Sequence, residues 1–129
     1  MLGVVVKYGS LAPFILDLED AGGYYTWQEA VNEFGNRLPT KEQSSAWISQ
    51  QEAVQSAIRA FGGNITGLGV YDNNFPENDA RHYCWYWTRS SEPNSVLAWG
   101  VSLRFGNVSH FYKTYTSRVR PVIPVTEPY

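Results

Sequence analysis

A polar loop, residues 71–79, holds a group of side-chain oxygens that could bind a cation. It carries Asp72, Asn74, Glu77 and Asp79, whose carboxylate and amide oxygens are the hard ligands that Ca²⁺ prefers. The loop lacks the glycine and the terminal glutamate of an EF-hand, and Pro76 interrupts the spacing. We therefore interpret it as an ordinary turn-rich loop and expect neither a bound metal nor a cofactor.

A second cluster of carboxylates consists of Asp17, Glu19 and Asp20, which are followed by Gly22 and Gly23. Carboxylates this close together could form an acid/base pair or a cation site. Charged residues beside glycines are typical of loops, however. The sequence favours a solvated loop that leads into a helix.

The possible nucleophiles and bases of the chain have no catalytic context. His82 and His110 are far apart and stand in no spacing that metal sites favour. Cys84, the single cysteine, lies in an aromatic run and is expected to be a buried, inert thiol. Ser90 and Ser91 lack the surroundings of a nucleophile elbow, and the glycines form neither a phosphate-binding loop nor a dinucleotide fingerprint. We predict that the chain is not an enzyme.

Composition limits the remaining classes of protein. The chain has 129 residues with 43% hydrophobic and 17% charged residues, which predicts one globular domain over residues 1–129. A formal charge of −2 gives no basic footprint for nucleic acid. No apolar run reaches transmembrane length, and residues 2–6 are too short for a signal-peptide core, so we expect no membrane insertion and no signal peptide. Five tryptophans and nine tyrosines exceed what a core needs and suggest a contact surface.

Residues 24–43 contain the clearest secondary-structure signals in the chain. Thr26 and Glu29 form a capping box at the start of an amphipathic helix, and Gly35 ends that helix. Thr40 and Gln43 form a second capping box. It opens a helical region that extends to about residue 61, and the crowded polar residues predict a break near residue 49. The sequence thus predicts two core-facing helices.

The other elements are predicted to be strands. Short apolar runs indicate strands at residues 3–7 and 14–18, and an aromatic run indicates one at residues 82–88. Residues 96–105 and 108–112 flank Gly106-Asn107, a two-residue hairpin signal. Residues 118–125 form the last strand, which Pro121 and Pro124 mark as an edge. The fold class is α+β.

The following motifs, in this order, resemble the Fibrobacter-succinogenes-major-type domains. In the first half the matching residues are Gly3-Val4-Val5-Val6, Ile15-Leu16-Asp17-Leu18-Glu19-Asp20, Thr26-Trp27 with Ala30, and Arg37-Leu38-Pro39-Thr40-Lys41-Glu42. In the second half they are Tyr86-Trp87-Thr88-Arg89-Ser90-Ser91-Glu92, Ala98-Trp99, Gly106-Asn107-Val108, Lys113 and Val119-Arg120-Pro121-Val122. Those domains are bacterial and phage surface modules with a C-type-lectin-like fold. The resemblance implies two helices packed on one small, twisted antiparallel sheet.

The chain is also similar to the variable proteins of diversity-generating retroelements, which use the same fold. In that family a fixed frame holds a C-terminal half that carries targeted substitutions. The frame positions would here be Trp87, Ser91, Glu92, Ala98, Trp99, Gly106, Val108, Lys113 and residues 119–122. The resemblance implies that Trp27 and Trp99 belong to the core.

A calcium-dependent lectin is a third reading of the sequence. Glu92-Pro93-Asn94 matches the sugar-binding triplet of mannose lectins, but no Trp-Asn-Asp follows to complete a calcium shell. A single cysteine also makes the two disulfides of that family impossible. We interpret the triplet as coincidence.

The expected binding surface lies on the strand at residues 108–112 and its neighbours. Alternation along a strand places His110 and Tyr112 on one face and Ser109 and Phe111 on the other. The residues expected to bind a ligand are Asn94, Ser95, Ser102, Arg104, His110, Tyr112, Thr114 and Tyr115. The leading hypothesis is a non-enzymatic receptor-recognition domain on a phage virion or bacterial cell surface, whose partner is a protein or glycan of a cell surface. A structural or adhesin module without a specific site is the alternative.

Overall fold

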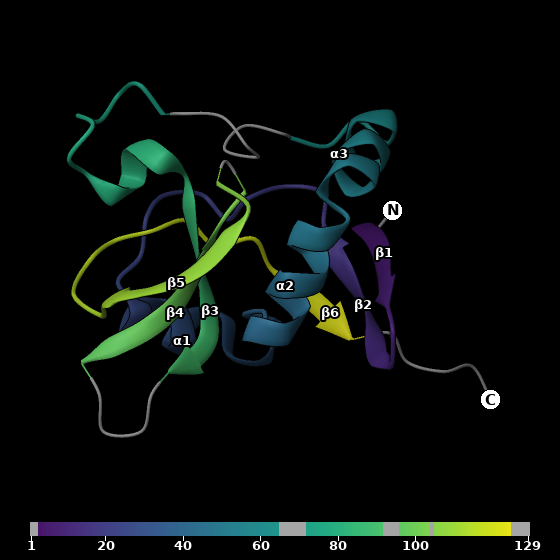
Figure 1. Ribbon diagram of the computed structural model, residues 1–129, viewed down its shortest axis with the longest axis horizontal. Coiled ribbons are helices and arrows are strands. Elements are labelled where there is room, and N and C mark those ends of the chain that lie inside the picture. The colour runs from purple at the N-terminus through teal and green to yellow at the C-terminus, as the bar shows by residue number, and fades with distance from the viewer. Residues whose placement is uncertain (1–2, 65–71, 92–95, 104, 125–129) are drawn as a thin grey trace.

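The computed structural model describes residues 3–64, 72–91, 96–103 and 105–124. Its first sheet joins both ends of the chain. Strands β1 (Gly3–Tyr8), β2 (Leu11–Asp17) and β6 (Val122–Pro124) are antiparallel in the order β1-β2-β6 (Figure 1). The predicted edge position of the last strand is confirmed, although this strand is shorter than residues 118–125.

A second antiparallel sheet carries the aromatic half of the sequence. It consists of β3 (Trp85–Ser91), β4 (Leu97–Ser102) and β5 (Asn107–Tyr112), in that order. The hairpin between β4 and β5 is longer than the two residues predicted, because Ser102 pairs with Asn107. The backbone N–H of Gly106, at φ +67°, donates to the carbonyl of Ser102 at 2.9 Å and closes this turn.

Three α-helices lie between the N-terminal hairpin and the second sheet in sequence. They are α1 (Trp27–Phe34), α2 (Lys41–Ser49) and α3 (Gln51–Ala60), with a short 3₁₀ turn η1 (Gly35–Arg37) after the first. Both predicted capping boxes are present, with Thr26 and Thr40 as the N-caps. The predicted break is also confirmed, because Gln50 leaves helical geometry between α2 and α3.

The chain is α+β, as expected, but its elements differ from the expected two helices and one sheet. The part of the chain that the structure describes has three α-helices and two small antiparallel sheets. A further 3₁₀ turn, η2 (Ala80–Tyr83), occupies the start of the strand predicted at residues 82–88. The strand begins only at Trp85, because Cys84 takes a left-handed conformation with φ +54°.

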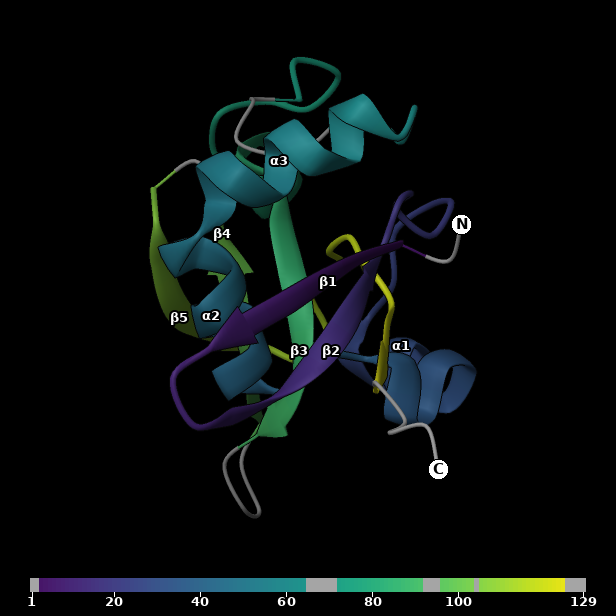
Figure 2. The same ribbon diagram turned by 90° about the vertical axis from the view of Figure 1, so that its right-hand side faces the viewer.

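Helix α2 stands between the two sheets and contacts strands of both (Figure 1). The larger hydrophobic cluster lies there and includes Trp47 of α2, Leu16 of β2, Ile58 of α3 and Tyr86 of β3. Helix α3 covers β1, as Figure 2 shows. The second sheet is therefore covered by α2 on one face.

The opposite face of the second sheet packs against α1. This smaller cluster contains Ala30, Leu38, Trp87, Ala98 and Val119. None of the described helices is long and apolar enough to cross a membrane.

The core tryptophans are not the expected ones. Trp47 and Trp87 are fully buried, whereas Trp27 and Trp99 are only partly buried. The indole N–H of Trp27 donates to the carbonyl of Thr88 at 3.0 Å, so Trp27 bridges α1 and β3 at the rim of the smaller cluster. Neither tryptophan is thus fully buried as a core residue would be, although Trp27 packs against the smaller cluster.

Candidate ligand-binding surface

Strand β5 turns two of the predicted site residues outward on the same face. His110 pairs with Trp99 and Tyr112 pairs with Leu97 across the β4–β5 ladder, so all four side chains lie on one face of the sheet. The rings of His110 and Trp99 stack with centroids 4.7 Å apart and planes 17° apart. Both His110 and Tyr112 are exposed, which confirms that they share an accessible face.

Phe111 fixes the orientation of β5 from the other face. Its ring lies 4.4 Å from that of Trp85 and 6.2 Å from that of Trp87, centroid to centroid. A Cβ at Gly100 would come within 2.9 Å of the Phe111 ring, so only glycine leaves room for it. With Phe111 packed inward, its neighbours His110 and Tyr112 must point outward.

Beyond the end of β5 the surface continues with Tyr115. Its ring meets that of Tyr112 edge-on at 5.6 Å, and the two residues are 47% and 52% exposed. Thr114 beside them is exposed too. We call His110, Tyr112, Thr114 and Tyr115 the β5 surface.

Two lysines border this region and cover the tryptophans. The Nζ of Lys41, at the start of α2, lies 3.7 Å from the centroid of the Trp99 ring. The Nζ of Lys113 lies 4.5 Å from the centroid of the Trp27 ring. The Lys41 ammonium and the His110 ring both contact the Trp99 ring. The aromatic surface that remains exposed here is therefore that of the tyrosine rings.

The structure excludes one predicted site residue and leaves others outside the described residues. Ser102 is fully buried, because it lies on the opposite face of β4 from Trp99. Its Oγ accepts a hydrogen bond from the backbone N–H of Phe105 at 3.2 Å, so including Ser102 in the exposed patch was wrong. The remaining predicted positions, Asn94, Ser95 and Arg104, lie outside the described residues, as does the triplet at residues 92–94.

A pocket adjoins the β5 surface and brings in residues that the sequence did not indicate. It has a volume of about 420 Å³ and is lined by Asn78, Asp79, Arg81, Thr114, Tyr115 and Thr116. One wall comes from the loop and turn around η2 and the other from the connection between β5 and β6, which lie on the same side of the molecule in Figure 1. We call this the η2 pocket. Arg81 and Asp79 are two residues apart, but nothing in the sequence pairs them with residues 114–116.

Asp20 contradicts the expectation of a solvated carboxylate loop. Its side chain is only 6% exposed, and one oxygen accepts from the Nε of fully buried Arg120 at 2.8 Å. The hydroxyl of Tyr86 donates to both carboxylate oxygens at 2.9 and 3.0 Å. Burial raises the pKa of the Asp20 carboxyl, while Arg120, Tyr86 and Arg118 oppose that rise. Asp20 is therefore a buried anchor for the segment that precedes β6.

Arg118 connects Asp20 to the polar loop before η2. Its Nη1 lies 3.6 Å from an oxygen of Asp20, and its Nη2 lies 2.6 Å from Oδ2 of Asp72. The hydroxyl of Tyr24 donates to the same oxygen of Asp72 and accepts from Arg118 at 2.8 Å. We call Asp20, Asp72, Arg118 and Arg120, with Tyr24 and Tyr86, the buried charge cluster.

The buried charge cluster explains the titration of its outer members. Partial burial disfavours ionised Asp72, but the hydrogen bonds from Tyr24 and from the backbone N–H of Asn74, with the charge of Arg118, outweigh it and lower the pKa of Asp72. Burial and the hydrogen bond to Asp72 raise the pKa of Tyr24 to about 12. Asp72, the first oxygen ligand of the supposed cation loop, is therefore already neutralised by a guanidinium.

The other reactive groups are enclosed. Cys84 is buried, and desolvation raises the pKa of its thiol, which disfavours the nucleophilic thiolate. His82 is buried with Nδ1 2.9 Å from the carbonyl oxygen of Phe75. Among the described residues, no three His, Cys, Asp or Glu side chains are grouped so that they could hold a metal ion.

Comparison with known proteins adds no relative to this picture. The chain matches no model of a known protein family, and no curated protein sequence matches it.

Proposed function

We propose that the chain is a non-enzymatic recognition domain of a phage or bacterial surface protein and that its architecture is C-type-lectin-like. The observation that carries the proposal is the β5 surface, where Tyr112 at the end of β5 and Tyr115 just beyond it are about half exposed, while Phe111 on the other face packs against the smaller cluster. Exposed aromatic residues grouped on one face mark interaction sites. Tyrosine suits such a site because its ring supplies contact area with little side-chain entropy to lose.

The support for the β5 surface is rigid, which favours binding. Phe111 sits between Trp85 and Trp87, and the ring of Trp99 is held by His110 and Lys41. A surface that is ordered before binding loses less entropy when the ligand arrives. The exposed tyrosine rings therefore lie on or just beyond a strand that is already held in place by the contacts of Phe111 and Trp99.

The similarity to retroelement variable proteins fits residues 109–117 only in part, because Phe111 and Ser117 stand outside the expected frame and yet are not exposed. Phe111 is partly buried and Ser117 is buried, whereas His110, Tyr112, Thr114 and Tyr115 are exposed. Substitutions at the exposed positions alter ligand contacts with little effect on packing. In the proposed role, variation is tolerated at the β5 surface and restricted at Phe111 and Ser117.

The proposal assigns no catalytic step to the chain. The buried carboxylates Asp20 and Asp72 are paired with arginines, and the Cys84 thiol has a raised pKa in a buried position. A general base or nucleophile must reach a substrate in a suitable protonation state. These groups are instead committed to internal contacts.

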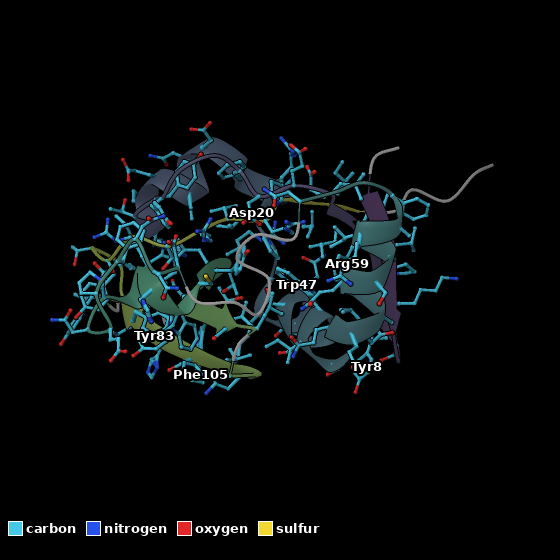
Figure 3. The ribbon with its side chains drawn as sticks, turned by 90° about the horizontal axis from the view of Figure 1, so that it is seen from above. Tyr8, Asp20, Trp47, Arg59, Tyr83 and Phe105 are labelled. Carbon is cyan, nitrogen blue, oxygen red and sulfur yellow. The ribbon has the colours of Figure 1, made fainter. Side chains whose placement is uncertain are left out.

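Adsorption to intact bacteria tests the proposal. The fluorescently labelled domain, displayed on beads so that avidity reveals weak binding, is incubated with a panel of Gram-negative and Gram-positive strains and counted by flow cytometry. Three proteins are compared: wild type, the double variant Tyr112→Ala/Tyr115→Ala, and Tyr8→Ala. Tyr8 is 52% exposed, and it lies in Figure 3 on the side of the molecule away from the second sheet, so it is a matched control.

We expect wild type and Tyr8→Ala to adsorb equally to at least one strain. The double variant should lose about tenfold or more of this binding, as truncation of aromatic anchors does at interfaces, with an unchanged unfolding midpoint. Equal adsorption of the double variant would move the site away from β5. Absence of adsorption to every strain would reject recognition of a bacterial surface.

A further inference from the structure

The η2 pocket has the lining of a site for a polar ligand. Its volume of about 420 Å³ is within the range of roughly 300–1,000 Å³ in which small molecules bind. The lining side chains carry one amide (Asn78), one carboxylate (Asp79), one guanidinium (Arg81), two threonine hydroxyls (Thr114 and Thr116) and one aromatic ring (Tyr115). An apolar molecule would leave most of these groups without partners, which is costly.

The charged wall of the pocket is already ordered. The Nε and Nη2 of Arg81 donate to the two carboxylate oxygens of Asp79 at 3.0 and 2.7 Å, and the backbone N–H of Arg81 donates to Oδ1 at 2.9 Å. The guanidinium also lies 4.2 Å from the centroid of the Phe75 ring. Arg81 and Asp79 are nevertheless 33% and 25% exposed, so their remaining donors and acceptors face the pocket or solvent.

The loop that carries this wall is tied to the rest of the fold. Asp72, at its start, is held by Arg118 and Tyr24 of the buried charge cluster. The ring of Phe75 packs edge-on against Tyr24 at 5.0 Å. The wall that carries Asp79 and Arg81 is therefore held in place before any ligand enters, which lowers the entropic cost of binding.

Charge balance points to a neutral ligand. Asp79 and Arg81 carry opposite charges and neutralise each other, and the other four lining residues are uncharged. An anionic ligand would have to compete with Asp79 for Arg81, and a cation would have to compete with Arg81 for Asp79. The guanidinium of Arg81 donates hydrogen bonds and the carboxylate of Asp79 accepts them. Side by side, the two groups match neighbouring hydroxyl groups of a ligand, because each hydroxyl both donates and accepts.

Tyr115 supplies the single apolar feature of the pocket. Its ring is 47% exposed, and its edge-on contact with Tyr112 sets its orientation. The face of an aromatic ring carries partial negative charge and attracts the weakly positive C–H groups of a ligand. A pyranose ring combines such a C–H face with a rim of hydroxyls, which is the pattern that this lining complements.

We propose that the η2 pocket binds a neutral pyranose sugar, whose hydroxyls contact Asn78, Asp79, Arg81 and Thr114 and whose C–H face lies on Tyr115. This inference rests on the proposed recognition function and specifies the ligand chemistry at one end of the β5 surface. It uses no metal ion and none of residues 92–94. The sugar is an end group of a larger surface glycan, of which the pocket holds one unit.

Saturation-transfer-difference NMR tests the inference on the intact chain. The probes are the methyl glycosides of glucose, galactose, mannose and N-acetylglucosamine, with methyl glucuronide as the anionic comparison, all in EDTA. The pocket variants are Asn78→Ala and Thr114→Val. Asn73→Ala is the matched control, because Asn73 is exposed in the same loop and does not line the pocket.

We expect at least one neutral glycoside to give saturation transfer, strongest at its C–H face. Each pocket variant should weaken this binding by about tenfold, as loss of a ligand hydrogen bond does, while Asn73→Ala retains it and all unfolding midpoints stay equal. No neutral glycoside binding, binding of the glucuronide alone, or undiminished binding to both pocket variants would each overturn the assignment.

The result separates this inference from the proposed function. Tyrosine-dependent adsorption to bacteria without glycoside binding would reject the sugar site alone. Glycoside binding that the pocket variants weaken, without adsorption to any strain, would reject recognition of a bacterial surface and leave the sugar site standing.

Discussion

Replacing Asp20 with asparagine removes the negative charge that two arginines share inside the protein. The carboxylate is 6% exposed, bonds to Arg120 at 2.8 Å and lies 3.6 Å from Arg118. After the substitution Arg118 still has Asp72, but the acceptors of Arg120 are all uncharged: the carbonyl oxygens of Asp17 and Asn64 and the oxygen of the new amide. The buried guanidinium of Arg120 is then left without a counter-charge.

The expected loss of stability follows from the contacts removed. Breaking a buried ion pair by removing one partner costs about 3–5 kcal/mol. Asparagine retains one oxygen that can accept from Arg120, so we expect the lower end, about 3 kcal/mol. This is a large share of the roughly 5–15 kcal/mol that stabilises a typical domain.

Asp17→Asn is the matched control, because Asp17 lies three positions earlier and also faces an arginine. Its oxygen is 3.7 Å from Arg37, and the two side chains are 32% and 52% exposed. Exposed pairs of this kind contribute about 0–1 kcal/mol. The asparagine would still accept the backbone N–H of Glu19, which now donates to Asp17 at 3.1 Å.

Guanidinium denaturation followed by tryptophan fluorescence measures both variants. We expect the free energy of unfolding to fall by about 3 kcal/mol for Asp20→Asn and by less than about 1 kcal/mol for Asp17→Asn. Equal losses for the two variants would refute the reasoning, because they would mean that burial of Asp20 does not determine its contribution.

Three other perturbations follow from the structure. Trp47→Ala should lower the unfolding free energy by about 3–5 kcal/mol and Trp99→Ala by clearly less, because Trp47 is fully buried and Trp99 is not. Equal losses of unfolding free energy for the two variants in urea titrations would contradict this. Because the folded pKa of Asp72 lies below its ordinary 3.8, its ion pair stabilises the protein above that pH and ceases to do so as the pH falls through the folded value. Asp72→Asn should therefore be less stable than wild type by about 1–3 kcal/mol at pH 6, a gap that narrows below pH 3.8 and that unfolding curves at both pH values would measure. EDTA should leave the thermal midpoint unchanged, since Arg118 already neutralises Asp72; a clear drop would reveal a native-state cation.

The features that the sequence predicted correctly depend on near neighbours. The two capping boxes, the positive φ of Gly35 at the end of α1 and the break at Gln50 involve backbone groups within a few residues, so local sequence determines them. The alternation of His110, Phe111 and Tyr112 was predicted for the same reason. These signals supplied the helices and the exposed face of β5.

The errors arose where contacts join distant parts of the chain. Asp20 looks like a loop carboxylate because Arg118 and Arg120, its counter-charges, lie near the other end of the sequence. The error at Ser102 has another cause: by alternation this residue lies on the Phe111 face, opposite His110, in the predicted two-residue hairpin as well as in the observed one. The η2 pocket could not be predicted, because no local pattern relates Asp79 and Arg81 to Thr114.

The position of β6 next to β2 has a consequence for synthesis of the protein. Phe14 pairs with Pro124, so β2 cannot complete its pairing until a strand much later in the sequence has been made. Until then β2 presents an open hydrogen-bonding edge, and apolar Leu16 lacks Val122 beside it. Such long-range closure slows folding and prolongs exposure to aggregation. The nascent chain therefore completes its first sheet only after residues 122–124 have been synthesised, and until then the open edge of β2 is where a chaperone would be most useful.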